Sequence, residues 1–344
     1  MARETLMSNE YFACRITGFG THVPERVLTN ADFEKMLDTS DEWIVSRTGI
    51  RKRHVSDERV TTSDLAAEAA RYALNDAGVT AEDITHILFG TCTPDALCPI
   101  SACGLAYKLG LKGVAALDFN VGCSGFVYGL SLTRGVLCAE PNAKVLLVAA
   151  ERLTSRANMQ DRSTAVLFGD GAGVFVVTAG MERPEAPKPG LRIVDVILKS
   201  DGSLGDLLTI HGGGSIHPYH LGDVVGEEYY LHMNGREVFK YAVRYMAQIS
   251  LELLARNNLT IADIDLVIPH QANQRIIEAV GNRLALPEEK VFSVVAEYGN
   301  TSAASIPLAL GDARRQGRIR PGMRMLLPVF GGGFTWGAAI LQVD

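Results

Sequence analysis

The chain contains no uninterrupted run of about eighteen apolar residues, which is the length that a membrane-spanning helix requires. Its start, MARETLMSNEYFACRITGFG, carries acidic and polar side chains where a secretory signal peptide would have an apolar segment. From these two absences we expect neither a membrane span nor a signal peptide, and therefore a cytoplasmic protein with no membrane partner.

Patterns of paired cysteines are missing as well. The six cysteines follow neither CxxC spacing nor the spacing of a metal site. Most of them stand in apolar stretches, so we expect reduced thiols in a cytoplasm rather than a disulfide framework. Four are expected to be small core residues, namely Cys14, Cys92, Cys103 and Cys138. The histidines of the Gly-rich stretch 211–220 lack ligand spacing too, and we predict no metal site.

An excess of basic residues is also absent. The chain has 33 Lys and Arg against 39 Asp and Glu, a net charge of -6, which argues against a surface for nucleic acid. An apolar content of 47% is typical of a globular enzyme. At 344 residues the chain exceeds one ordinary hydrophobic core, so we expect two domains or a duplicated unit.

Three short segments contain the side chains of one reaction centre: VGCSG (121–125), PHQAN (269–273) and YGNTSAAS (298–305). Cys123 follows a short apolar run and precedes a helical pattern, so we predict a nucleophile at a strand-to-helix turn. The start of a helix favours the thiolate, and we expect the pKa of Cys123 to be lowered. His270 adds an imidazole and Asn300 a carboxamide. Cys, His and Asn together indicate covalent acyl transfer.

The sequence also contains an internal repeat. Residues 73–91 (ALNDAGVTAEDITHILFGT) align without gaps on residues 253–271 (LLARNNLTIADIDLVIPHQ) at an offset of 180. GCSG falls opposite GNTS, so Cys123 and Asn300 are expected at matching positions. FGDGAGVFVV and FGGGFTWGAAIL each predict a Gly-rich turn that runs into a strand.

This repeat predicts two similar layered halves around a pseudo-twofold axis. The boundaries that we predict are 12–182 for the half with the nucleophile and 190–344 for the half with His and Asn. The divide falls in GMERPEAPKPG, at 180–190, where Pro, Gly and charged residues cluster.

Taken together, VGCSGFVYGL, FGDGAG, PHQANQRI, GNTSAASIPLAL and FGGGFTWGAAIL resemble β-ketoacyl-[acyl carrier protein] synthase III, a family of the thiolase superfamily. The resemblance runs from about residue 14 to the C-terminus and includes DTSDEWIVSRTGIRKRH at 38–54. It implies an α/β protein with the thiolase-like, duplicated, five-layered αβαβα fold. It further implies a homodimer and a condensing enzyme that initiates fatty-acid synthesis without a cofactor, since the CoA thioester is a substrate.

The resemblance also implies a mechanism. Cys123 attacks an acyl-CoA to give an acyl-enzyme, and malonyl-[acyl carrier protein] then enters and loses CO2. His270 and Asn300 donate hydrogen bonds to the resulting enolate. The backbone N–H groups of Cys123 and Gly332 form the oxyanion hole of the condensation step.

Substrate-binding residues follow from the same resemblance. Trp43 and Arg162 would enclose the adenine of CoA, with Thr39 and Arg47 nearby. Two further groups of residues are implied: Asn273 and Gly235 along the pantetheine tunnel, and Lys240 and Arg275 as contacts of the acidic acyl carrier protein. For the last two, a plain surface role is an equal alternative.

One position departs from the family pattern. In DALCPIS, at 95–101, short-chain members often have Phe where Cys98 stands, and a partner subunit supplies that residue to close the acyl pocket. The smaller Cys98 predicts a pocket open to longer or branched primers. Leu97 is the alternative filler of that space.

Other interpretations remain open. HMG-CoA synthase and the secondary-metabolite ketosynthases and acyltransferases share the fold and nucleophile, although GNTSAAS and GGGFTWG favour synthase III. A Cys-His-Asn hydrolase of the papain type would have its Cys near the N-terminus and no duplication. A non-catalytic partner subunit would usually lack the nucleophile. Asn300 could instead cap the following helix.

Overall fold

The computed structural model describes residues 13–180 and 190–344. Nine strands form one sheet in the order β11-β12-β13-β8-β1-β7-β6-β4-β5. Their bounds are β1 Ala13–His22, β4 His86–Gly90, β5 Ala115–Phe119, β6 Lys144–Arg152, β7 Asp170–Gly180, β8 Leu191–Ser200, β11 Leu266–Val267, β12 Arg324–Gly331 and β13 Thr335–Val343. The predicted divide at 180–190 falls almost entirely outside the described residues, and the predicted boundaries stay a prediction.

The strand order repeats between the two halves of the sequence. The first half contributes β1-β7-β6-β4, with β5 at the edge, and the second half contributes β8-β13-β12-β11 in the corresponding order. In each half the inner strands run antiparallel, whereas β4 with β6 and β11 with β12 are parallel. The two runs meet where Arg15 and Ile16 of β1 pair with Arg192 and Leu191 of β8.

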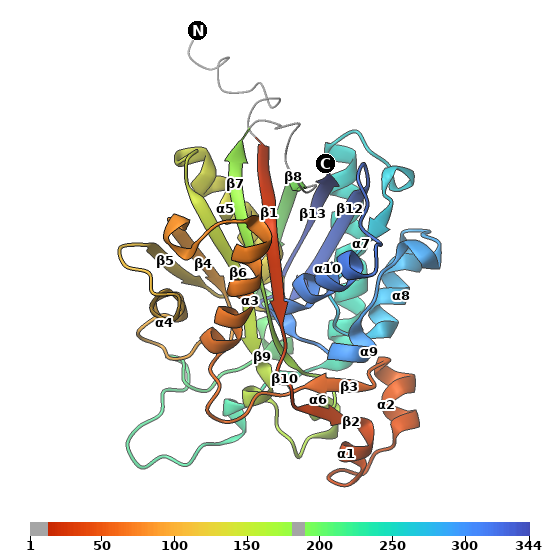
Figure 1. Cartoon of the computed structure of the whole chain (residues 1–344). Helices are drawn as coiled ribbons and strands as arrows, with labels where there is room; N and C mark the ends of the chain where they lie inside the picture. The colour runs from red at the N-terminus through yellow and green to blue at the C-terminus, as the bar shows by residue number, and fades with distance from the viewer. Residues whose placement is uncertain (1–12, 181–189) are drawn as a thin grey trace.

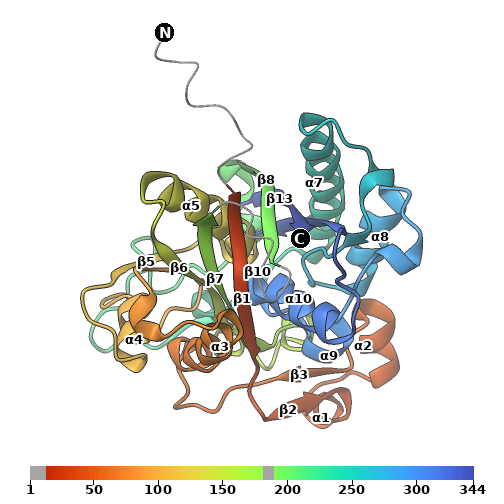
Figure 2. The same cartoon turned by 45° about the horizontal axis from the view of Figure 1, so that its top comes forward.

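The helices of eight or more residues cover and separate these runs of strands. They are α2 Asp41–Thr48, α3 Thr62–Ala77, α4 Ser101–Lys108, α5 Gly125–Ala139, α7 Gly235–Arg256, α8 Gln274–Arg283 and α10 Ser305–Arg315. Figures 1 and 2 show α3 over the strands of the first half and α7 on the opposite side, along those of the second.

Three apolar cores lie between these layers. The first joins α3 and α4 to one face of β6, through Leu146 and Val148. The opposite face of β6, through Leu147, enters a middle core that also contains α5, α10 and Leu327 of β12. The third joins α7 and α8 to the far face of β12, through Leu326. Alternation along each strand therefore builds the five αβαβα layers expected of the thiolase fold.

Local structure confirms the sequence repeat at its aligned segments. Thr80 and Asp83 form a capping box at the short 3-10 helix η1 (Ala81–Asp83), ahead of β4. Thr260 and Asp263 form the same box at η6 (Ile261–Asp263), ahead of β11. The reciprocal bonds satisfy backbone donors at both starts, so the same local sequence makes the same turn twice.

A small unit projects from one end of the layers, beside α8 and α9 (Figures 1 and 2). Its elements are β2 Val27–Thr29, α1 Asn30–Glu34, α2 and β3 Lys52–His54. The remaining short elements near that end are α6 Arg162–Ala165, β9 Leu208–Thr209, β10 His232–Met233 and α9 Val295–Tyr298. Among the residues that the structure describes, no helix is both long and apolar enough to span a bilayer.

The cysteine prediction was partly wrong. Cys14 is buried in the middle core as expected. Cys103 and Cys138 are exposed, because each lies on the solvent side of its helix rather than on the apolar side. Cys92 is half-buried and lines a cavity of about 1350 Å³. All six thiols are free.

Candidate active site

A cavity of about 1350 Å³ brings the three predicted reactive side chains together. Cys123, His270 and Asn300 all line it, although they come from segments far apart in the chain. Seven more of the predicted site residues line the same cavity: Trp43, Arg47, Leu97, Gly235, Asn273, Arg275 and Gly332. Thr39, Cys98, Arg162 and Lys240 are not among its lining residues.

Cys123 lies in the middle of the 3-10 turn η2 (Gly122–Ser124), between β5 and α5. The turn needs Gly122, whose φ of 53° is a left-handed conformation that glycine adopts at least cost. Burial raises the pKa of the Cys123 thiol to about 12, and a hydrogen bond with Ser302 opposes this increase. The expected lowering of this pKa is therefore wrong, because loss of water outweighs the helix start.

The end of β12 and the glycine turn that follows it pack against the turn that holds Cys123. A Cβ atom on Gly331 would lie 2.8 Å from the backbone nitrogen of Cys123, and one on Gly122 would lie 3.3 Å from that of Gly332. Thr335 ties the two turns together, since its hydroxyl donates to the Val121 carbonyl at 3.0 Å. The backbone amides of Cys123 and Gly332 are thus neighbours, as the oxyanion-hole hypothesis requires.

His270 follows β11, and its backbone N–H donates to the Pro328 carbonyl at 2.9 Å. Its Nδ1 lies 2.7 Å from the Ser305 hydroxyl, which also accepts from the Gln271 N–H at 3.4 Å. This arrangement favours Ser305 as the donor to Nδ1 and leaves the ring proton on Nε2. Burial lowers the pKa of His270 to about 3, so the ring is a neutral N–H donor at physiological pH.

Asn300 is 8% exposed and precedes the 3-10 turn η8 (Ser302–Ala304) and α10. Its Oδ1 accepts from the Ser302 N–H at 2.9 Å, and its backbone bonds to Leu167 and Gly169. The side chain therefore stabilises the turn, but it does not cap α10, whose N-cap residue is Ala304, so the capping alternative was wrong. Its carboxamide N–H groups remain the part that can donate to a substrate oxygen.

The predicted pairing of Cys123 with Asn300 in the repeat was wrong by three residues. The turns η2 and η8 stand at an offset of 180, so Cys123 corresponds to Ala303 and Gly122 to Ser302. Asn300 corresponds to Asn120, whose Oδ1 likewise accepts from the N–H two residues on, that of Gly122, at 3.1 Å. The sequence match between GCSG and GNTS was too short to fix this register.

The residues predicted to hold CoA lie only partly at the cavity: Trp43, Arg47, Gly235 and Asn273 line it, whereas Thr39 and Arg162 do not. The guanidinium of Arg162 lies 4.7 Å above the Trp43 ring and donates to the Asp38 carbonyl at 2.7 Å. An adenine between them would require Arg162 to move away from the ring. Asn273 caps α8 and donates to the Arg47 carbonyl at 3.2 Å, which joins α8 to the end of α2.

The two basic residues predicted to meet the carrier protein lie on α7 and α8. Arg275 lines the cavity, and its guanidinium lies 5.6 Å from the Phe239 ring. Lys240 is exposed and pairs with Glu237, one turn earlier on α7, at 3.4 Å.

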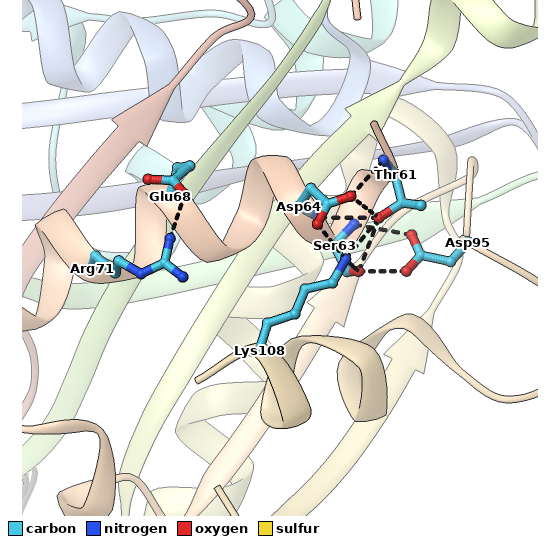
Figure 3. A network of polar contacts seen from close by, with 7 residues as sticks. All are labelled: Thr61, Ser63, Asp64, Glu68, Arg71, Asp95 and Lys108. Atoms are coloured by element: carbon cyan, nitrogen blue, oxygen red, sulfur yellow. Dashed lines mark hydrogen bonds and ion pairs between the residues drawn. The ribbon is translucent and has the colours of Figure 1, made fainter. Parts of the chain in front are cut away.

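The loop with Leu97 and Cys98 is held by the polar network of Figure 3. Asp95 accepts hydrogen bonds from the backbone and hydroxyl of Ser63, at the start of α3. Lys108 of α4 donates to the Ser63 hydroxyl at 2.7 Å and pairs with Asp64 at 2.6 Å. The anchored loop presents Leu97 to the cavity mouth, 86% exposed, while Cys98 faces solvent.

Two residues of this site, Glu151 and Ser302, were not predicted from the sequence, and a third, Cys92, was predicted only as a core residue. Glu151, at the end of β6, is fully buried behind the cavity wall. Ser302 lines the cavity and has a φ of 50°, which is unusual for a residue other than glycine. Cys92 contacts both of them. The one available signal was a charged residue directly after the apolar run VLLVAA.

Across residues 13–180 and 190–344, no cluster of His, Cys, Asp and Glu could hold a metal ion. The chemistry that these side chains support is nucleophilic attack by sulfur and stabilisation of an oxyanion by N–H donors.

Comparisons with known proteins agree with this chemistry. A sequence profile for 3-oxoacyl-[acyl-carrier-protein] synthase III matches residues 117–202, and the profile for the C-terminal part of that enzyme matches 254–343. A curated β-ketoacyl-[acyl-carrier-protein] synthase III from Nitratidesulfovibrio vulgaris is 62% identical over 327 residues, which cover 95% of this chain and 98% of the relative.

Two solved structures extend the likeness. The synthase III structure from Thermus thermophilus has 46% identity and a TM-score of 0.85, and the match covers 95% of this chain and 98% of that one. The priming β-ketosynthase from the R1128 polyketide pathway has 33% identity and a TM-score of 0.86, with 99% of each chain covered.

Proposed function

The chain belongs to the β-ketoacyl-[acyl-carrier-protein] synthase III family, and on this premise we propose its substrates and the residues that act on them. It is a condensing enzyme of fatty-acid initiation. In the proposed reaction an acyl-CoA and malonyl-[acyl carrier protein] give 3-oxoacyl-[acyl carrier protein], CoA and CO2. The observation that carries this proposal is the convergence of Cys123, His270 and Asn300 on one cavity.

Acylation comes first. The sulfur of Cys123 attacks the thioester carbonyl of the acyl-CoA, and free CoA leaves the acyl-enzyme. The negative oxygen of this step is stabilised by the neighbouring backbone amides of Cys123 and Gly332. Their closeness depends on the glycines of the turn after β12, because a side chain at Gly331 would collide with the Cys123 backbone.

Decarboxylation and condensation follow. Loss of CO2 from the malonyl group leaves an enolate, and its oxygen accepts hydrogen bonds from His270 Nε2 and the Asn300 carboxamide. The ring of His270 is neutral at physiological pH, and its Nε2–H can donate a hydrogen bond to the enolate oxygen without the ring carrying a positive charge. The enolate carbon then attacks the acyl-Cys123 carbonyl, the C–S bond breaks, and the released Cys123 thiolate takes up a proton from water to restore the free thiol.

Substrate binding is proposed for the outer cavity. Trp43 and Arg162 would stack on the adenine of CoA, with Thr39 and Arg47 nearby, while Gly235 and Asn273 line the path of the pantetheine arm. Lys240 and Arg275 would contact the acidic carrier protein. CoA enters only as part of the substrate in this proposal, which includes no further cofactor or metal.

We propose a homodimer in the cytoplasm. The edge strand β5 and its surroundings expose apolar side chains, namely Leu97, Tyr107 and Leu117 at 86%, 85% and 48%. A second copy that covered this edge would remove these side chains from water. Six free thiols suit a reducing compartment. Light scattering during gel filtration would give the assembly state.

The proposed primer is longer than acetyl, or branched. Cys98 is exposed beside the cavity mouth and would reach the acyl pocket of a partner subunit rather than its own. Exchange of this thiol for a phenyl ring would fill space that an acyl tail uses, and each buried methylene is worth about 0.8 kcal/mol.

One experiment tests both the reaction and the primer. The protein is incubated with acyl-CoAs from acetyl to octanoyl, the intact mass is measured, and digestion locates the added acyl group. We expect it on the Cys123 peptide, and we expect malonyl-[acyl carrier protein] to release it as 3-oxoacyl-[acyl carrier protein]. The variant Cys98→Phe should shift the ratio of acylation rates towards acetyl-CoA. Acylation at another cysteine, or none with any primer, would overturn the proposed function.

A further inference from the structure

Ser302 has a backbone conformation that its residue type disfavours. Its φ of 50° is left-handed, where a Cβ atom crowds the main chain. The corresponding turn of the first half has Gly122 at this place, with a φ of 53°, and glycine adopts this conformation at little cost. A residue other than glycine keeps such a conformation only where its surroundings hold it, and such residues cluster at functional sites.

The contact that holds Ser302 is with Glu151, at the end of β6 in the other half of the chain. The Ser302 hydroxyl donates to the Glu151 carboxyl at 3.1 Å, and the two residues are 1% and 0% exposed. The carboxyl is itself held, because it accepts from the Thr93 hydroxyl at 2.5 Å and from the Cys92 backbone N–H at 3.1 Å. A buried carboxyl depends on such donors for its stability, so it is a fixed anchor for the serine hydroxyl.

The backbone N–H of Ser302 decides which way the Asn300 carboxamide faces. It donates to Asn300 Oδ1 at 2.9 Å, which leaves the Nδ2 hydrogens as the part of the group that can donate to a ligand in the cavity. The main chain of Asn300 is fixed separately, by bonds to Leu167 and Gly169. A flipped carboxamide would turn its oxygen towards an enolate oxygen, and two acceptors repel each other. The bond from Ser302 therefore selects the useful orientation.

We propose that Ser302, anchored by Glu151, is a positioning residue that orients the Asn300 carboxamide for the decarboxylation step. The inference rests on the proposed role of Asn300 as a donor to the enolate, and it adds the two residues that hold this donor. Both act through hydrogen bonds alone, and no covalent bond changes at either. Acylation of Cys123 precedes the enolate, so it should not depend on this orientation.

The test measures two steps in the full-length protein: acylation of Cys123 by acyl-CoA, followed by intact mass, and release of labelled CO2 from malonyl-[acyl carrier protein]. Ser302→Ala removes the hydroxyl anchor and keeps the disfavoured backbone. This variant should lower kcat for CO2 release about tenfold, the rate equivalent of the lost backbone preference. Its KM for malonyl-[acyl carrier protein] and its acylation rate should not change, because the enolate charge develops only in the transition state.

Two further variants separate the anchor from the backbone. Ser302→Gly also lacks the hydroxyl but adopts the left-handed conformation readily, as Gly122 does, so it should recover most of the rate that Ser302→Ala loses. Glu151→Gln has one acceptor oxygen in place of two and should slow CO2 release about threefold. Glu151→Gln should have no further effect in the Ser302→Gly protein, which has no hydroxyl to anchor. If Glu151→Gln does not fold, the two Ser302 variants carry the test.

A double variant tests whether Ser302 acts through Asn300. Ser302→Ala added to Asn300→Ala should slow CO2 release no further than Asn300→Ala alone, because the carboxamide is already absent. Ser250→Ala is the matched control. Ser250 is a fully buried serine on α7 whose hydroxyl donates to the Met246 carbonyl at 2.7 Å, and it does not line the cavity. This control should leave both rates unchanged.

Wild-type CO2 release in Ser302→Ala, together with slow release in Asn300→Ala, would overturn the positioning role and leave the proposed function intact. Equal losses in Ser302→Ala and Ser302→Gly would also overturn it, since the backbone conformation would then not matter. So would an equal loss of acylation in Ser302→Ala, which would indicate distortion of the whole site. Wild-type release in Asn300→Ala would instead overturn the proposed role of Asn300 itself.

Discussion

The turns η2 and η8 have nearly the same backbone and very different side chains. In each, an Asn side chain accepts a bond from the N–H two residues on, a left-handed residue follows, and a helix begins three residues later. The first turn has Gly122 and Cys123 where the second has Ser302 and Ala303. The two helix starts touch, since a Cβ on Gly125 would lie 2.9 Å from that of Ala303.

The comparison teaches that the two halves share one turn backbone, while their side chains serve different steps of the proposed reaction. The nucleophile belongs to the first turn, and Asn300, a proposed donor to the enolate, precedes the second. At the strand ends behind them, Glu151 of β6 corresponds to Gly331 of β12 at the offset of 180. Each lies against the turn of the other half, one with a carboxyl and one with bare backbone.

Replacement of the nucleophile should have the largest effect. In Cys123→Ser, acyl-enzyme formation should fall below detection, because a hydroxyl ionises far less readily than a thiol. Intact-mass measurement after incubation with acyl-CoA checks this result. An acyl adduct on Cys92 or Ser302 in this variant would show that the first turn is not the sole source of the nucleophile.

Asn120 and Asn300 offer the next test, since their turn bonds match and their proposed chemistry does not. Asn300→Ala should acylate normally but decarboxylate malonyl-[acyl carrier protein] roughly 100- to 1000-fold more slowly, the usual loss for an oxyanion donor. Asn120→Ala should lose only a turn bond, about 1 kcal/mol of stability. Release of labelled CO2 is the measurement, and equal rates in both variants would remove Asn300 from the enolate.

The two halves differ in a titratable group, because His270 stands where the first half has Gly90, the last residue of β4. This histidine should make the free energy of unfolding depend on pH. The folded-state pKa of His270 is lowered to about 3, so below pH 6.5 the unfolded chain binds a proton that the folded chain rejects. Stability should therefore fall with pH from 6.5 towards 3. At pH 5 this loss is about 2 kcal/mol.

Urea unfolding of wild type and His270→Gln at pH 7.5 and pH 5 isolates this contribution. We expect the variant to lose about 2 kcal/mol less between the two pH values. An identical loss in both proteins would mean that His270 titrates normally in the folded state.

A smaller effect is expected at the left-handed residues Gly122 and Ser302. Gly122→Ala should destabilise the protein by about 1–2 kcal/mol, the cost of a side chain in this conformation. Ser302→Gly should be at least as stable as Ser302→Ala, because glycine relieves the same cost. Thermal unfolding compares the pairs, and a fully tolerated alanine at Gly122 would break the parallel between the turns.

The smallest and most symmetric effect concerns the two capping boxes. Thr80→Ala and Thr260→Ala should each cost about 1 kcal/mol, since each removes one cap at the same local turn. The double variant should show the sum, because the sites lie in different halves. Urea unfolding of the three variants provides the values. A clear difference between the single variants would show that the tertiary setting has outweighed the repeat.

The sequence predicted those features that depend on local pattern. The aligned segments at an offset of 180 predicted the repeated strand order, and the family motifs predicted the five layers. The side chains of Cys123, His270 and Asn300 were expected at one centre because they end or follow buried strands, and the cavity unites them.

Features that depend on tertiary contacts could not be predicted from the sequence. The pKa of Cys123 was expected to be low from its helix start, but burial by both halves reverses the direction. Glu151 reads as an ordinary charged residue at a strand end, and its partner Ser302 lies 151 residues further along the chain. The register of the two turns was visible only from their backbone.

The middle core has a consequence for how the chain reaches its native state. α5 and α10 pack between strands of both halves, so neither half can cover its inner apolar face alone. A fragment with one half would expose that face and associate or be degraded. The strands of the second half must therefore pack on α5 and α10 before the first half becomes stable. We expect the chain to fold slowly and as one cooperative unit.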